Sequence, residues 1–252
     1  FETFLSAAAR IGGGNPTLPA SHARSFIKPG QARVAWASET VPLQGQKANA
    51  TNSLSWDQLE AELNASADVL AEIRRTSENL PTYWVSNPTN LARPPVSNYI
   101  HLRNAVQWLA ADCLVALHAK QPARAREDLH AITRLARVYR EDYALVSQMI
   151  RVAIVGLGVS ATWEVLQADD WMEADLSAMQ EDWEQLDLAR DIERGVVGER
   201  AYFEHHLARL HDGDLGLLQL ATGGTPGAGK SAKDLLERGV LLPLWRANKV
   251  SD

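Results

Sequence analysis

Apolar residues recur at helical spacing through five successive segments between Val96 and Asp212. Side chains three or four residues apart lie on one face of an α-helix, so this spacing predicts amphipathic helices rather than strands. Almost no alternating, strand-like pattern separates the five segments. The pattern therefore predicts an all-α fold in which helical hairpins pack as a bundle or a short repeat array.

The first two segments are expected to pair as an antiparallel hairpin, because only a short turn separates them. Ser97 is a plausible cap for the first, and Pro122 stands where the first turn of the second would be. Their apolar stripes consist of Leu102, Val106, Leu109, Cys113 and Leu117, and then of Ala125, Leu129, Ile132, Leu135 and Tyr139.

The third segment, from Tyr143 to about Gln167, is apolar almost all round. A helix of this kind is normally covered on several sides, so we expect it at the centre of the domain. Gly156 and Gly158 would allow a neighbouring helix to approach closely. The uncharged run between Arg151 and Glu164 is shorter than the roughly 18 residues of a membrane span, which favours a buried helix.

The rest of the chain predicts a single domain with less regular ends. A capping box at Ser55 and Gln58 begins one helix, and Asp170 with Glu173 has the same form. The expected parts are an irregular N-terminal part at 1–95 with a helix near 55–78, a helical core at 96–212, a flexible glycine-rich segment at 213–231 and a C-terminal helix within 232–252.

Composition narrows the function classes. The formal net charge of the 252 residues is -6, which argues against a broad nucleic-acid surface, because phosphate binding needs clustered Lys and Arg. The single cysteine, Cys113, falls in an apolar stripe and is expected in the core.

One segment matches a nucleotide-binding motif by letter. Residues 224–231 fit the P-loop pattern G-x4-G-K-[ST]. A P-loop needs a parallel sheet around it, whereas the preceding chain is helical and only 21 residues follow Ser231. The segment is therefore interpreted as a glycine-rich linker, and binding of ATP or GTP that Lys230→Ala abolishes would contradict this interpretation.

Two groups of side chains invite a metal interpretation, and neither has the required spacing. The acids Asp169, Asp170, Glu173 and Asp175 lack the glycine and ligand alternation of a calcium loop. Among the histidines of the last segment, His206 and His211 are five residues apart, so they do not share a helix face. No metal and no cofactor is expected.

Polar residues stand out on the otherwise apolar helices. They are Ser147, Gln148 and Arg151 in the third segment and Glu193, Glu199 and Arg200 in the fifth. A buried Arg151 would need a partner, so an ion pair with Glu199 or Glu193 is a natural hypothesis. The set would form either a structural network or the floor of a pocket, and the structural alternative is favoured because no nucleophile with its base accompanies it.

The core also resembles a known group of proteins. The stretches Leu109–Leu114, Ala123–Ala125, Leu135–Arg137, Leu145–Ala153 and Gly198–Ala201 resemble a group of helical proteins from planctomycete- and verrucomicrobium-type bacteria. The first hairpin also resembles a tetratricopeptide helix pair, without that repeat's glycine and aromatic positions. The resemblance implies an all-α fold, sometimes behind an N-terminal membrane anchor, and no established activity.

The leading functional expectation is a non-enzymatic helical scaffold or accessory subunit with a protein partner. The alternative is an enzyme or small-ligand-binding protein with an inter-helix pocket near Arg151 and Glu199. The chain begins at Phe1 without a signal pattern, so we expect a segment upstream, and membrane association through such a segment stays open. The compartment, cytoplasmic or anchored at the bacterial cell envelope, stays open.

Overall fold

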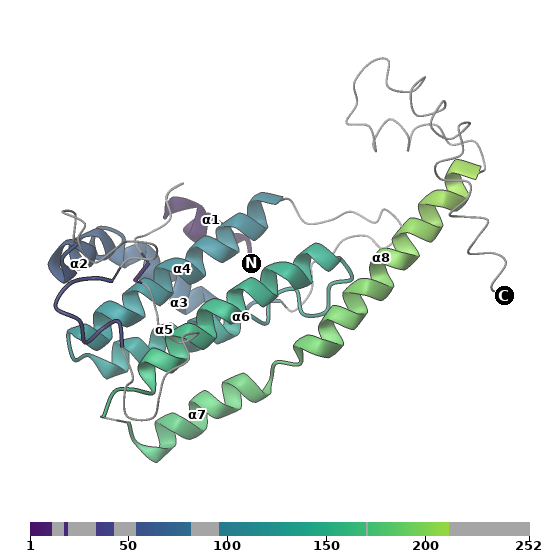
Figure 1. The fold of residues 1–252 in the computed structure, drawn as a ribbon. Helices are drawn as coiled ribbons and strands as arrows, with labels where there is room; N and C mark the ends of the chain where they lie inside the picture. The colour runs from purple at the N-terminus through teal and green to yellow at the C-terminus, as the bar shows by residue number, and fades with distance from the viewer. Residues whose placement is uncertain (12–17, 20–33, 43–53, 82–95, 170, 212–252) are drawn as a thin grey trace. The chain divides into compact units, whose positions relative to one another are not determined.

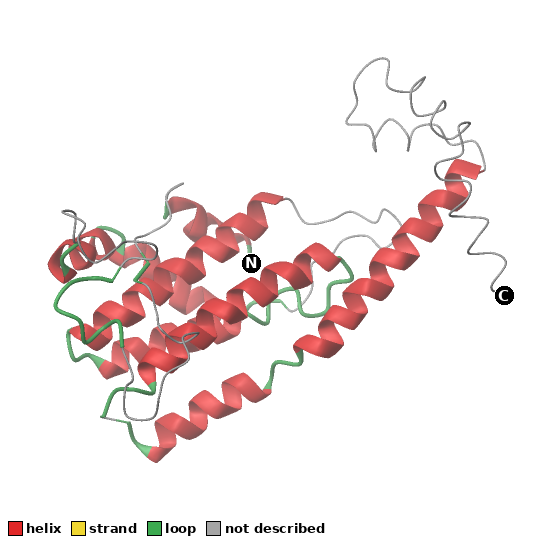
Figure 2. Cartoon of the chain, viewed as in Figure 1, coloured by secondary structure: helices red, strands yellow, loops and turns green. Residues whose placement is uncertain are grey.

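The chain folds into α-helices (Figures 1 and 2). The structure is a computed structural model that describes residues 1–11, 18–19, 34–42, 54–81, 96–169 and 171–211. The helices are α1 (Glu2–Arg10), α2 (Trp56–Asn64), α3 (Ala67–Ser77), α4 (Val96–His118), α5 (Pro122–Leu135), α6 (Leu145–Val165), α7 (Glu173–Glu184) and α8 (Leu188–His211).

The described residues belong to two compact units, 1–196 and 197–252. In the first unit α4 is the central helix, because it packs against α1, α2, α3, α5 and α6. Its sequence explains this position, since most side chains from Tyr99 to Leu117 are buried. The α4–α5 hairpin is confirmed, with Pro122 in the first turn of α5 and both predicted stripes in the core.

The N-terminal third contributes three helices to this core. α1 packs on α3 and α4, and Phe4 is completely buried. Ser55 caps α2 through the predicted capping box: its hydroxyl accepts from the Gln58 N–H, and Gln58 accepts from the Ser55 N–H. The helix expected near 55–78 is nevertheless interrupted at Ala65 and Ser66, where α2 ends and α3 begins.

Two predicted helix starts are corrected. Ser97 is not a cap, because α4 already includes Val96. α7 is capped at Met172, whose N–H donates to the Asp175 carboxylate, rather than by an acid at position 170. The expected glycine-rich segment at 213–231, the helix within 232–252 and the P-loop-like match all lie outside the described residues.

The prediction for α6 is wrong in one important respect, because α6 lies at the side of the core. One face packs on α4 and α5 through residues such as Ile154, Gly158 and Ala161. The opposite face is exposed although it is apolar. In the described part of the chain, α6 is the helix that by length and composition alone could cross a membrane. One third of its most apolar 18-residue stretch is buried inside the protein.

Candidate functional site

Arg151 is the centre of a buried polar cluster where α5, α6 and α8 meet. Its side chain is completely buried. The guanidinium donates to the Ala136 carbonyl (2.8 Å), the Gln148 side-chain carbonyl (2.7 Å) and the Asp191 carboxylate (2.8 Å). Burial lowers the pKa of Arg151, and the hydrogen bond and charge of Asp191 oppose that shift. The ion pair with Asp191 thus offsets the free-energy cost of burying the Arg151 charge.

Gln148 and Ser147 hold the connection between α5 and α6. The Gln148 amide donates to the carbonyls of Tyr139 (3.1 Å) and Asp142 (2.8 Å). The Ser147 hydroxyl donates to the Asp142 carboxylate and lies 2.8 Å from the Tyr99 hydroxyl. Since both side chains are buried, these bonds satisfy polar groups that would otherwise be costly.

Tyr139 shows why this connection needs such support. Its φ of 64° lies in the left-handed region, which a residue with a side chain rarely adopts. Its ring packs edge-on against Tyr99 and Phe1, at centroid distances of 5.4 and 5.9 Å. Because Gln148 also holds its carbonyl, the conformation is fixed from two sides.

The structure brings together half of the polar set singled out in the sequence. Ser147, Gln148 and Arg151 belong to one cluster. The hypothesis that Glu199 or Glu193 pairs with Arg151 is wrong, because Asp191 is the partner. The remaining members are elsewhere: Glu193 is exposed, Glu199 and Arg200 belong to the second unit, and Arg200 pairs there with Glu204 at 2.7 Å.

Sequence reasoning missed Asp191 although a signal was present. Gly195 follows it by four residues and therefore lies on the same face of α8. A Cβ at Gly195 would come within 2.9 Å of the Gln148 Cγ and 3.3 Å of the Leu145 Cα, so α8 approaches α6 closely there. Asp191, one helical turn before Gly195, therefore faces Arg151, whereas Glu193 lies on another face of α8.

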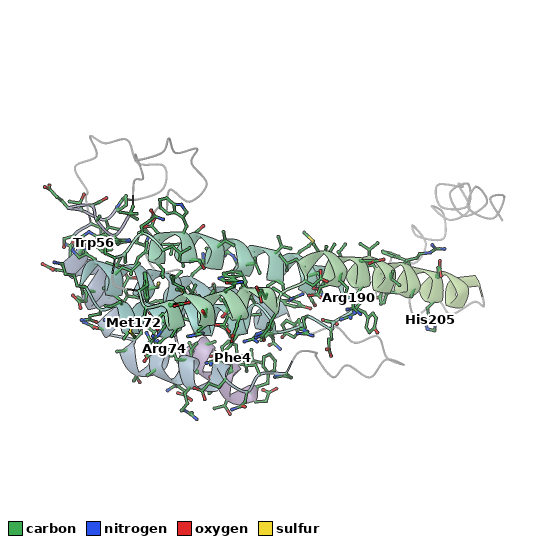
Figure 3. The ribbon with its side chains drawn as sticks, turned by 90° about the horizontal axis from the view of Figure 1, so that it is seen from below. Phe4, Trp56, Arg74, Met172, Arg190 and His205 are labelled. Carbon is green, nitrogen blue, oxygen red and sulfur yellow. The ribbon has the colours of Figure 1, made fainter. Side chains whose placement is uncertain are left out.

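A second buried cluster, which the sequence reasoning missed entirely, joins α3, α4 and α5. The carboxylates of Asp112 and Asp128 are both completely buried. Arg74, labelled in Figure 3, donates to both of them, at 2.7 Å in the case of Asp128. Arg124 binds the Asp112 carboxylate through two nitrogens. Two arginines and two acids thus fasten three helices at one point.

The two acids of this second cluster are not equivalent. Burial, together with the neighbouring charge of Asp112, raises the pKa of Asp128 well above its ordinary range, although Arg74 opposes the shift. Asp128 is therefore the carboxyl that binds a proton more readily than an ordinary aspartate, while Asp112 accepts from both arginines.

Neither cluster is arranged for catalysis or metal binding. The Ser147 hydroxyl is buried and occupied by Asp142 and Tyr99, so a substrate has no access to it. Within the ranges that the structure describes, no group of three His, Cys, Asp or Glu side chains could hold a metal ion. Both clusters hold neighbouring helices together through hydrogen bonds and ion pairs.

The outer face of α6 is the remaining feature that core packing leaves unexplained. We give this name to a stripe of large apolar side chains that are between 36 and 64% exposed. The stripe consists of Val146, Met149, Val152, Val159 and Leu166. The only two charged residues between Leu145 and Val165, Arg151 and Glu164, are both turned into the core. A helix 21 residues long thus presents no charge to the surroundings.

Comparison with known proteins gives no match: no family model fits the chain, and neither the curated proteins nor the solved structures contain a similar protein.

Proposed function

We propose that the protein is a non-enzymatic helical scaffold or accessory subunit, and that the outer face of α6 is its docking surface for a protein partner. The observation that carries the proposal is the orientation of α6. Both of its charges point inward, while at least five large apolar side chains point outward. Scattered surface hydrophobics are common, but a stripe along a whole helix is a feature of binding surfaces.

The size of the stripe supports the proposal. The exposed fractions of its five residues correspond to roughly 400 Å² of apolar surface, which is the scale of functional patches on monomeric proteins. The helix is also held rigidly, because the Arg151 cluster and the contacts with α4 and α5 fix its inner face. A rigid surface loses little conformational freedom on binding, which favours affinity.

A protein fits this surface better than an anionic membrane does. The connection after α6 carries the exposed acid Asp169, and α7 adds further acids along its length, beginning with the exposed Glu173. Membrane-surface helices rely instead on Lys and Arg beside their apolar face.

The likeness of the α4–α5 hairpin to a tetratricopeptide pair supports the scaffold class. The two helices pack closely and antiparallel around a shared core, as in helical repeats that bind peptides and proteins. The group of bacterial helical proteins that the sequence resembles is of the same fold class. This support is by analogy of architecture and adds no site residue.

The alternative, a small-ligand or enzyme pocket near Arg151 and Glu199, has one observation in its favour. The Arg151 Nη2 atom is buried without a hydrogen-bond partner. Against it, three other hydrogen bonds already occupy this guanidinium, and Asp191 balances its charge. The docking surface is therefore the better-supported proposal.

The experiment is site-specific photocrosslinking in the cells that make the protein. A photoreactive amino acid replaces Met149 on the outer face of α6 and, as a matched control, the exposed Glu181 on α7. We expect a discrete protein adduct from position 149 and none from position 181. Adducts with lipid alone, or equal labelling from both positions, would contradict the proposal.

A further inference from the structure

α7 is the short helix between α6 and α8, and it packs on α5 with little apolar contact (Figure 1). Of its 12 residues, Asp175 and Met179 are buried, and Trp183 is half-buried. These three side chains follow one another at steps of four residues, so they lie on one face of the helix. One buried methionine and part of one tryptophan are thus the main apolar contacts that hold α7 in place.

Charged side chains supply the other contacts of α7 with α5 and with the turn that follows α5. Arg126 pairs with Asp175, and His130 pairs with Asp182. Arg137, in the turn after α5, lies 3.9 Å from the same Asp182 carboxylate. The three basic side chains are between 21 and 34% exposed, so ions in the solvent reach these pairs and screen them.

The charge of Asp182 favours the packed position of α7. Burial alone would raise the pKa of Asp182, but the hydrogen bond and charge of His130, together with the charges of Arg137 and Arg134, lower it. One carboxylate on α7 therefore faces three basic side chains from α5 and the turn after it. Because packing stabilises the ionised carboxylate, removal of its charge should loosen α7.

The chain is fixed on both sides of α7. Before α7, the Trp171 indole N–H donates to the Val165 carbonyl at the end of α6, at 2.7 Å. After α7, the Asp191 carboxylate in the first turn of α8 accepts from Arg151 at 2.8 Å. Since α7 lies between these two anchors, it can leave α5 while α6 and the start of α8 stay in place.

Trp183 rests on Gly158 of α6. A Cβ at Gly158 would lie 3.0 Å from the Trp183 Cη2 atom and 3.0 Å from the Ile132 Cγ2 atom, so the ring fills the space that glycine leaves. The indole N–H donates to the Thr162 hydroxyl at 3.1 Å. Val159, which follows Gly158 directly, belongs to the outer face of α6. Removal of the ring would therefore uncover Gly158 and Ile132 beside that face.

We propose that α7 is a lid that opens as a unit, away from α5 and α6, when its charged contacts are weakened, while the rest of the core stays folded. Segments with few buried apolar contacts commonly open in this way, at a lower free energy than global unfolding. The closed form predominates, and the open form is a minor population that rising ionic strength increases. This inference goes beyond the proposed function and does not depend on what binds the outer face of α6.

Thiol labelling of Met179→Cys tests the lid, because this position on the inner face of α7 is only 4% exposed. The native Cys113, completely buried in α4, reports global unfolding in the same molecule. We expect the introduced thiol to react at least about tenfold faster than Cys113. Raising sodium chloride from about 50 to about 500 mM should accelerate its reaction several-fold and leave Cys113 unchanged. Equal rates at the two thiols, or a rate at position 179 that salt does not change, would overturn the proposal.

Two matched variants in the same Met179→Cys chain identify the charged contacts as the cause. Asp182→Asn and Glu181→Gln each remove one negative charge from α7, but Asp182 pairs with His130 whereas Glu181 is exposed. At low salt, Asp182→Asn should accelerate labelling at position 179 about threefold to tenfold, and Glu181→Gln should change it less than about twofold. Equal acceleration by the two variants would contradict a lid held by the contacts with α5.

Hydrogen exchange followed by mass spectrometry makes the same comparison without an introduced thiol. In the unchanged chain the amides of α7 should exchange at least about tenfold faster than those of α4, and added salt should accelerate the exchange of α7 alone. Exchange of α7 at the rate of α4 would show that α7 unfolds only together with the core, which would overturn the proposal.

Discussion

Replacing Arg151 by Met should strongly destabilise the fold, because the arginine is a structural partner rather than part of a pocket. The change leaves the Asp191 carboxylate buried without its counter-charge, and it removes the donor for the Ala136 and Gln148 carbonyls. Removing one partner of a buried ion pair typically costs about 3–5 kcal/mol. Met fills much of the same volume, so we expect a loss of about 3–4 kcal/mol, a large part of a domain's total stability.

The double variant Arg151→Met with Asp191→Leu separates the loss of the ion pair from general damage to the core. Two apolar residues in place of a buried pair are often neutral or stabilising, because no charge remains buried alone. We expect the double variant to recover most of the loss, to within about 1–2 kcal/mol of the unchanged chain.

Urea unfolding followed by far-ultraviolet circular dichroism measures both values. The slope of free energy against urea concentration should stay constant, which shows that the variants unfold from a similar native state. The reasoning is refuted if Arg151→Met unfolds at the same urea concentration as the unchanged chain. It is refuted equally if the double variant is no more stable than the single one.

Four further predictions concern the other buried groups. Asp112→Asn should cost about 2–4 kcal/mol in urea unfolding because two arginines lose their counter-charge, whereas Asp128→Asn, which resembles the protonated acid, should cost less than about 1 kcal/mol. Because the pKa of Asp128 is raised in the folded chain, the folded chain binds a proton at Asp128 more tightly than the unfolded chain does. The stabilisation from this protonation is complete below about pH 4 and is lost as the pH rises through the raised pKa. A pH series of unfolding midpoints should therefore show a smaller dependence on pH in Asp128→Asn than in the unchanged chain. Gly195→Ala should lower the free energy of unfolding by about 1–3 kcal/mol, because its Cβ meets the Leu145 backbone and the fixed Gln148 side chain. The Cys113 thiol, whose pKa burial raises, should react with a thiol reagent only after unfolding, and rapid labelling of the folded chain would show the core to be open.

The helices were predictable because their signal is local. Spacing of apolar residues, a capping box at Ser55 and a proline at the first turn of α5 all act within a few residues of chain. The break between α2 and α3 was not predicted, although Asn64 and Ser66 are weak helix formers next to it. Such residues lower helix propensity without fixing where a helix ends.

The side on which α6 is buried was less accessible to sequence reasoning. A helix that is apolar all round has no polar face to mark the solvent side, so the pattern predicted burial everywhere. The two charged residues of α6 were the available signal of which side is buried. Arg151 and Glu164 are 13 residues apart, which places them about 140° apart around the helix axis. Both are nevertheless buried, Arg151 beside Ala136 and Asp191 and Glu164 under the Ala35 N–H, which donates to its carboxylate at 2.8 Å. Their placement inward is what leaves the outer face without charge.

The buried acids show a similar limit. Asp112 stands inside an apolar run and Asp128 immediately precedes a core leucine, and each position was a signal of a buried charge. The sequence positions of the two acids do not indicate which basic residue pairs with them. Arg74 reaches Asp112 from 38 residues away, a contact that depends on how three helices pack.

The chain's three methionines provide the most direct test of the central claim, that a protein covers the outer face of α6. Met149 on that face and Met172 before α7 are 64 and 68% exposed, and Met179 is buried. Mild peroxide treatment followed by mass spectrometry compares their oxidation rates in the undisturbed protein. In the cells that make the protein Met149 should oxidise several-fold more slowly than Met172, whereas the two rates should converge in the purified chain, and Met179 should stay protected throughout. Equal rates for Met149 and Met172 in those cells would contradict the claim.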